Sequence, residues 1–160
     1  CVIYVPDDVE QSLFGYDPIY AGSRSRWVTP GKGDNMGFAA WVYLNATNLI
    51  RHLGPGYHYG EWWGQGIQRG YGVIGKRFSL FNPFRYTVPL DALYTVVPIL
   101  YEGPFSEDAI RAALREVAWQ GSKAAPGYMN AEGIVVYHHA SKATFKVTVS
   151  NDAKPKGGDA

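Results

Sequence analysis

Short apolar runs, several with alternating polar residues, predict most of the strands in this chain. They cover residues 2–5, 18–27, 57–63, 77–82 and 95–103. A glycine-rich loop follows the third run and extends to about Gly75. Pro98 lies within the last run, which indicates an edge strand or a bulge because proline cannot donate a ladder hydrogen bond.

Two segments show helical periodicity. Residues 35–52 predict an amphipathic helix that Asp34 or Asn35 can cap and that the Gly-Pro-Gly sequence at 54–56 ends. Ser106 predicts the start of a second helix, with acidic residues in the first turn, where the helix dipole favours them. Its apolar stripe consists of Ile110, Ala113, Leu114 and Val117.

Residues 131–139 and 143–151 alternate well and predict a β-hairpin. Glu132 is expected on one face with Ile134, and Lys146 on one face of the partner strand. The hairpin can therefore bring an acid and a lysine within reach, most simply as a cross-strand salt bridge. Antiparallel strands with two inserted helices indicate the α+β class.

Composition narrows the class of protein. The 160 residues fit one domain, and 46% hydrophobic and 15% aromatic content suffices for a core. The net charge of +1 neither favours nor excludes a nucleic-acid partner. The single cysteine fits a reducing compartment. Without a signal peptide or an apolar run of roughly 20 residues, a cytoplasmic protein without membrane contact is expected.

Glu61 lies in an aromatic strand, HYGEWWG. Alternation places Glu61 with Tyr59 and Trp63 on one face, and His58 and Trp62 on the other. An acid between aromatic neighbours is expected to be partly desolvated and to need a hydrogen-bond partner. A sugar hydroxyl is one such partner; a surface glutamate on an edge strand is the alternative.

Arg24 and Arg26 are two residues apart, so they share a face if this segment is a strand. Two guanidinium groups on one face suit a phosphate, and a solvated basic strand end is the alternative. His138 and His139 are adjacent, which is poor geometry for a shared metal, and no zinc site is expected. The G-x-S-x-G and G-x-x-x-x-G-K-[ST] strings do not occur.

Taken in order, five segments resemble motifs of the ATP-dependent RNA ligases, a family of covalent nucleotidyltransferases. The segments are SRSRW (23–27), YGEWWG (59–64), RFSLFN (77–82), EGIVVY (132–137) and FKVT (145–148). The resemblance implies a nucleotidyltransferase (ATP-grasp-like) adenylation domain, with antiparallel sheets and flanking helices. The implied domain, a partial one, extends over residues 1–152, and a flexible tail is expected at 153–160.

The resemblance also implies a chemistry. A lysine attacks the α-phosphorus of ATP, AMP passes to an RNA 5′-phosphate, and a 3′-hydroxyl then displaces it. ATP and Mg²⁺ are the implied cofactors, RNA ends are the partners, and the protein is expected to act as a monomer. By resemblance, Glu132 acts in the metal-assisted step as a metal ligand, and Lys146 contacts the α-phosphate.

The other implied roles concern nucleotide binding. Glu61 would hold the ribose hydroxyls, and Arg24 the ribose or the phosphate, with Arg26 as the alternative. Phe81 would stack on adenine, with Phe78 as the alternative.

The chain departs from this pattern in two places. The nucleophilic lysine of the family lies in a K-x-D-G motif, which does not occur here and is expected directly upstream of Cys1. This chain alone is therefore expected to be inactive with ATP, because it cannot form the lysyl-adenylate. Thr148 stands where the family often has a second lysine. A non-catalytic nucleotide- or RNA-binding module, and a carbohydrate-binding domain with aromatic stacking platforms, are the competing hypotheses.

Overall fold

The computed structural model describes residues 1–7, 18–86 and 93–149. The chain forms two compact units, Cys1–Val97 and Pro98–Ala160. That both belong to the one adenylation domain expected over residues 1–152 stays a prediction. The expected tail at 153–160 lies outside the described residues.

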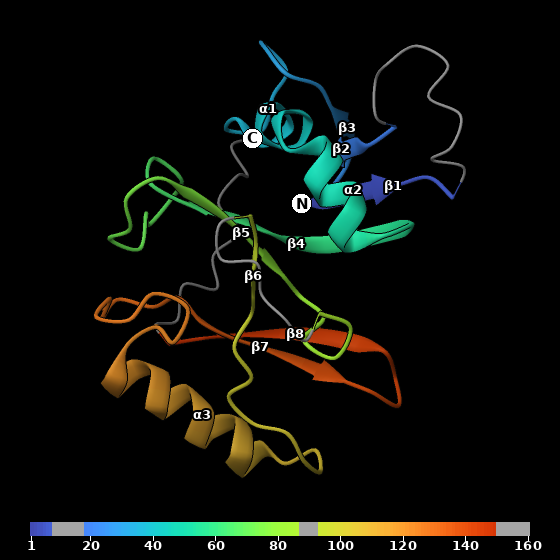
Figure 1. The fold of residues 1–160 in the computed structure, drawn as a ribbon. Helices are drawn as coiled ribbons and strands as arrows, with labels where there is room; N and C mark the ends of the chain where they lie inside the picture. Colours follow the sequence, from blue (N-terminus) through green and yellow to red (C-terminus); the bar gives the residue numbers. More distant parts are fainter. Residues whose placement is uncertain (8–17, 87–92, 150–160) are drawn as a thin grey trace, which may run out of the picture. The chain divides into compact units, whose positions relative to one another are not determined.

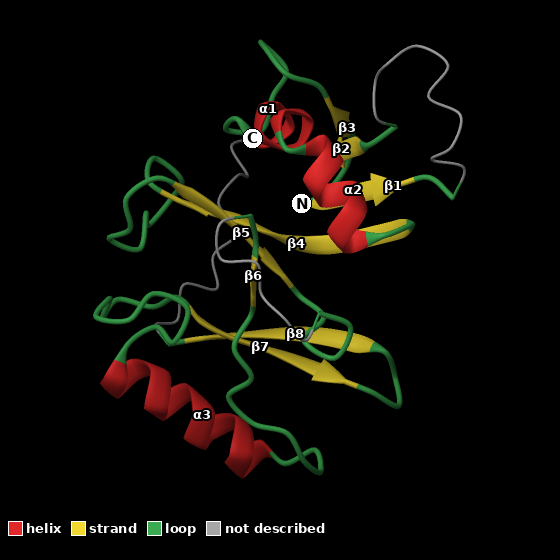
Figure 2. Ribbon diagram, in the orientation of Figure 1, coloured by secondary structure: helices red, strands yellow, loops and turns green. Residues whose placement is uncertain are grey.

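The first unit is built on a six-stranded sheet with the order β3-β2-β1-β4-β5-β6 (Figures 1 and 2). Its strands are β1 (Val2–Val5), β2 (Tyr20–Gly22), β3 (Trp27–Val28), β4 (Gly56–Gly64), β5 (Lys76–Leu80) and β6 (Thr95–Val96). All neighbouring strands pair antiparallel except β5 and β6, which are parallel.

Two short helices, α1 (Phe38–Leu44) and α2 (Ala46–Leu53), pack on this sheet. Before α1, the Asp34 carboxylate accepts hydrogen bonds from the amides of Ala39 and Ala40, at 2.8 and 2.9 Å. The sequence predicts one helix over 35–52, but Asn45 divides it. Its side-chain amide donates to the Trp41 carbonyl at 2.8 Å, which is the local competition with helical bonding typical of asparagine.

One face of the sheet packs against the helices, and the other, called the open face, carries exposed residues on β2 and β4, although Trp63 and Ser79 on it are buried. Ile3, Val5, Trp62, Phe78 and Leu80 form a core with residues of the helices, and each of them is at most 7% exposed. Because strand side chains alternate, their neighbours point away from the helices. In β4 the alternation is regular from Tyr57 to Trp62, as the sequence predicts. On the open face, β4 exposes Tyr59 and Glu61.

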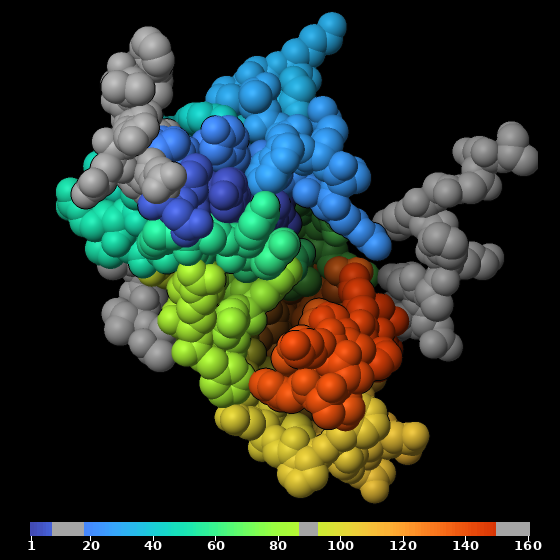
Figure 3. All heavy atoms as spheres, turned by 90° about the vertical axis from the view of Figure 1, so that its right-hand side faces the viewer, coloured from blue at the N-terminus to red at the C-terminus, as the bar shows by residue number. Residues whose placement is uncertain are grey.

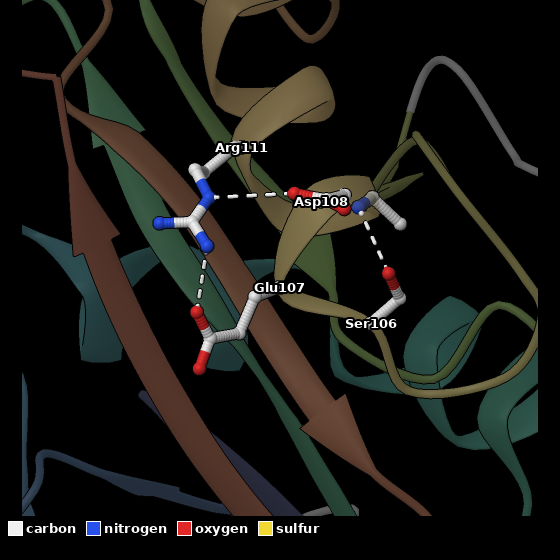
Figure 4. Close-up of polar contacts among 5 residues, drawn as sticks. Ser106, Glu107, Asp108 and Arg111 are labelled. Atoms are coloured by element: carbon white, nitrogen blue, oxygen red, sulfur yellow. Dashed lines mark hydrogen bonds and ion pairs between the residues drawn. The ribbon is translucent and has the colours of Figure 1, made fainter.

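The second unit consists of α3 (Glu107–Gln120) and a hairpin of β7 (Gly133–His138) and β8 (Ala143–Thr148). Its core contains Ala113, Val117, Ala131 and Ile134. As predicted, Ser106 caps α3: its hydroxyl accepts a hydrogen bond from the Ala109 amide at 3.4 Å. Figure 4 shows this cap and Arg111, which contacts both acids of the first turn.

Two predicted strands are wrong in their extent. Residues 18–27 form β2 and β3 with a turn between them, where the Ser23 amide donates to the Arg26 carbonyl at 2.8 Å. Of residues 95–103, only Thr95–Val96 are paired. The segment after them contains Pro98 and leads out of the first unit. The α+β class, with mostly antiparallel strands, is confirmed for the described residues.

Candidate functional site

Glu61 lies on the open face of the sheet, in the second half of β4. Its side chain is exposed, in contrast to the flanking Gly60 and Trp62. The predicted face is therefore confirmed, but the expected desolvation is wrong, because the open face leaves this carboxylate in water. Glu61 is therefore a carboxylate accessible from solvent.

The start of β1 lies beside Glu61. The Cys1 amino group donates to the Gly60 carbonyl at 2.8 Å, and the Gly60 amide donates to the Cys1 carbonyl at 3.0 Å. Burial lowers the pKa of this amino group, and the charge of Glu61 opposes that shift. The two groups are thus close enough to interact electrostatically.

The two candidate phenylalanines lie in different environments. Phe78 is 1% exposed and packs against Phe38 and Trp41 in the core, with ring centroids 5.4 and 5.7 Å apart. Phe81 is 49% exposed. Its amide donates to the Tyr59 carbonyl at 3.0 Å, so it continues the pairing of β5 with β4. Of the two, only Phe81 presents an accessible ring.

Arg24 and Arg26 do not share a strand face, because both lie in the turn between β2 and β3. This expectation is wrong: the predicted strand ends at Gly22. Arg26 donates to the Gly33 carbonyl at 3.2 Å, whereas Arg24 projects from the middle of the turn as an exposed residue. Gly22 pairs with Val2, and Val2 with Tyr59, so this turn follows β2 at the end of the sheet where Glu61 lies.

A polar network on the same sheet face as Glu61 was not anticipated from the sequence. The Trp63 indole donates to the Ser79 hydroxyl at 2.7 Å, and that hydroxyl lies 2.6 Å from the Thr95 hydroxyl. Arg77 lies over the Trp63 ring, 5.7 Å from its centroid. These contacts fix β4 against β5 and β6 beside Glu61, and they depend on a strand register that local patterns do not specify.

Glu132 and Lys146 meet in the second unit, as predicted. The Lys146 ammonium donates to the Glu132 carboxylate at 2.5 Å, with side chains 55% and 32% exposed. Lys146 is paired with Val135, so simple alternation would put Glu132 on the opposite face. Glu132 precedes β7. Gly133, the first residue of that strand, has a φ of 156°, which changes the direction of the backbone between Glu132 and the rest of β7.

Only glycine fits at this position. A Cβ at Gly133 would lie 2.1 Å from the Val147 carbonyl oxygen. The Glu-Gly pair of EGIVVY is thus a structural unit, in which the glycine allows the close strand contact that turns the glutamate towards Lys146.

No group of three or more histidine, cysteine, aspartate or glutamate side chains in the described part of the chain is arranged to hold a metal ion. Glu132 is a single carboxylate. Mg²⁺ usually keeps several waters and binds proteins through one or two carboxylates together with substrate phosphates. One carboxylate, with the lysine beside it free to meet a phosphate, is compatible with that mode of binding.

Several aromatic residues of the open face also went unrecognised as a group. They are Tyr4, Tyr20, Trp27, Tyr57 and Tyr59, referred to below as the aromatic row. The alternation in YHYGEW places Tyr57 and Tyr59 on the face of Glu61. Their assembly with the others depends on pairing between distant segments.

Among the residues that the structure describes, no helix has the length and apolar character required to cross a membrane. Comparisons of the chain with protein-family models, with curated proteins and with solved structures found no match.

Proposed function

We propose that this chain belongs to an ATP-dependent RNA ligase and supplies nucleotide-binding and phosphate-binding groups of its adenylation domain. The observation that carries the proposal is the order of five motif-like segments, three of which bring charged or aromatic side chains to accessible positions in the first unit. Glu61 and Phe81 lie on the open face or at its margin, and Arg24 is exposed in the adjacent turn.

Each side chain has a role that suits its chemistry. The Glu61 carboxylate accepts hydrogen bonds from the ribose hydroxyls, and Phe81 stacks on adenine. Arg24 binds the ribose or a phosphate. Because Glu61 is exposed, the ribose hydroxyls can reach its carboxylate from solvent.

Lys146 and Glu132 carry the roles in the second unit. Lys146 neutralises the α-phosphate, and Glu132 is the carboxylate for Mg²⁺, which supplies charge neutralisation during phosphoryl transfer. In the structure, the two side chains neutralise each other. Binding of a nucleotide together with Mg²⁺ would give each of them a partner of opposite charge, the phosphate for Lys146 and the cation for Glu132.

The first test measures ATP binding by calorimetry in the presence of Mg²⁺. Because charged hydrogen bonds contribute about 1.5–3 kcal/mol, Glu61→Gln should weaken ATP binding about tenfold or more. Glu102→Gln, at an exposed glutamate of the second unit, is the matched control and should bind like the parent. No ATP binding by the parent chain, or equal binding by Glu61→Gln, would contradict the proposal.

A second test addresses catalysis without the missing lysine. With radiolabelled ATP the chain should form no covalent adduct, since K-x-D-G does not occur. An RNA strand that already carries 5′-linked AMP needs no lysine nucleophile. A neighbouring 3′-hydroxyl attacks the phosphorus of the RNA 5′-phosphate, a new phosphodiester forms and AMP leaves.

A ligase domain should seal this adenylated RNA. Sealing should be lost in Lys146→Met and kept in the control Lys142→Met.

The absence of the K-x-D-G string also favours the second candidate, a non-catalytic nucleotide- or RNA-binding module. Such a module would bind ATP or RNA but would leave the adenylated strand unsealed.

A further inference from the structure

The aromatic row runs across the open face of the first unit. Tyr20 and Tyr57 each pair with Tyr4 in the strand register, so the three tyrosines lie side by side on β2, β1 and β4. The Tyr4 ring stacks on both neighbours, with centroid distances of 6.0 Å to Tyr20 and 4.5 Å to Tyr57. Trp27 and Tyr59 extend the row, 6.1 Å from Tyr20 and 6.2 Å from Tyr57.

These rings are accessible to solvent. Tyr20, Trp27, Tyr57 and Tyr59 are between 48% and 59% exposed, and Tyr4 is half-buried between them. In the space-filling view, dark blue atoms from the start of the chain reach the surface between lighter blue and teal-green neighbours (Figure 3). A continuous exposed group of large aromatics is unusual on a folded protein and marks a binding surface.

The chemistry of the row favours a planar, polar ligand. Tyrosine dominates it, and a tyrosine ring offers a flat apolar face together with a hydroxyl that keeps the surface wet. The row contains no aliphatic side chains, which an apolar protein partner would favour. Nucleic-acid bases stack on such rings whatever their sequence.

Arginines lie at two places beside the row and have the sign that a phosphate backbone requires, whereas Glu61, beyond Tyr59 on the same face, has the opposite sign. Arg24 and Arg26 lie in the turn that joins β2 to β3, next to Trp27. At β4, the exposed Arg85 donates to the carbonyls of Tyr57 and Pro55, at 3.4 and 3.2 Å. Stacking rings flanked by guanidinium groups are the combination by which single strands are bound without sequence preference.

We propose that the aromatic row binds single-stranded RNA, with bases stacked on its tyrosines and Trp27 and phosphates beside Arg24 and Arg85. This inference deepens the proposed function, since it assigns a surface to the RNA strand. Apart from Arg24, its side chains are not those proposed for ATP.

The test uses fluorescence anisotropy of a labelled single-stranded RNA of mixed sequence, without a 5′-phosphate and without ATP. The double substitution Tyr4→Leu with Tyr57→Leu should weaken binding at least tenfold, because stacking contributes about 1–3 kcal/mol per base. Tyr4→Phe with Tyr57→Phe keeps the rings and should bind within about twofold of the parent. Tyr43→Leu, at a 40%-exposed tyrosine on α1, is the control for loss of a surface tyrosine elsewhere.

Three results would overturn the inference: no RNA binding by the parent chain, equal binding by the double leucine variant, or equal affinity for a fully paired duplex. Circular dichroism of each variant separates loss of binding from loss of folding. If the double leucine variant unfolds, single leucine substitutions at the more exposed Tyr20 and Tyr59 replace it. Because the assay omits ATP and sealing, it can fail while the ligase proposal stands, and the reverse also holds.

Discussion

His58 shows what the fold does to one ionisable side chain. It is fully buried, and its Nε2 lies 2.8 Å from the Gly54 carbonyl, which can only accept. Nε2 therefore carries the proton, and Nδ1 accepts from the Tyr86 hydroxyl at 2.6 Å. Burial, with a smaller contribution from the nearby Arg85 charge, lowers the pKa of His58 to about 4, against the opposing effect of the Gly54 hydrogen bond.

A pH dependence of stability follows from this shift. Between about pH 6.5 and pH 4 the unfolded chain binds a proton at His58 and the folded chain does not, so the free energy of unfolding falls as the pH falls through this window. His58→Gln removes the titrating group and should make the dependence shallower there, as measured by urea unfolding at several pH values. His52→Gln, at an exposed histidine, should keep the parent slope. An unchanged slope in His58→Gln would show that other groups cause the dependence.

At this scale, alternation was sufficient to predict which face Glu61 and Trp62 occupy. Alternation was insufficient to predict how exposed these side chains are and which groups they contact. The exposure of Glu61 depends on what covers the sheet, and α1 and α2 of the first unit pack on the opposite face. The meeting of Glu132 with Lys146 was predicted from hairpin pairing, but its geometry depends on the backbone at Gly133.

At the scale of elements, sequence patterns worked where one segment contains all the information. The helix α3 has its cap, acidic first turn and apolar stripe within one stretch, and the β7–β8 hairpin joins neighbouring strands. Patterns failed at residues 18–27 and 95–103, where a turn or a change of unit interrupts an apolar run. They also missed the helix break at Asn45, since capping by a side-chain amide leaves the helical periodicity intact.

The hairpin offers a test of how one glycine shapes an element. Gly133→Ala should open the contact with Val147 and separate Glu132 from Lys146, because the added Cβ has no space. Gly127→Ala is the matched control: Gly127 has a φ of 88°, but a Cβ there would meet nothing within 4 Å. Backbone strain alone should destabilise this control by about 1–2 kcal/mol.

Chemical denaturation and amide exchange of β7 and β8 measure the difference. Gly133→Ala should lose clearly more stability than Gly127→Ala and should lose protection along the hairpin. Equal losses would mean that strain, and not the contact with Val147, is what Gly133 relieves.

At the scale of the whole molecule, the two units have separate cores. Trp62 belongs to the first: its indole donates to the Met36 carbonyl at 3.1 Å, and its ring packs against Phe38 and Trp41. Val117 belongs to the second core, in α3. Composition and length favoured one domain, and neither property reports how contacts are divided along the chain.

Substitutions in the two cores test whether the units unfold together. Trp62→Ala should cost about 3–5 kcal/mol, since it removes a large buried ring. If the units are independent, native-state hydrogen exchange should become faster at amides of β4 and β5 and stay unchanged in α3. Val117→Ala should have the reverse pattern. Faster exchange in both units after either substitution would instead show one cooperative domain, and the stability of the Lys146 region would then depend on the aromatic core around Trp62.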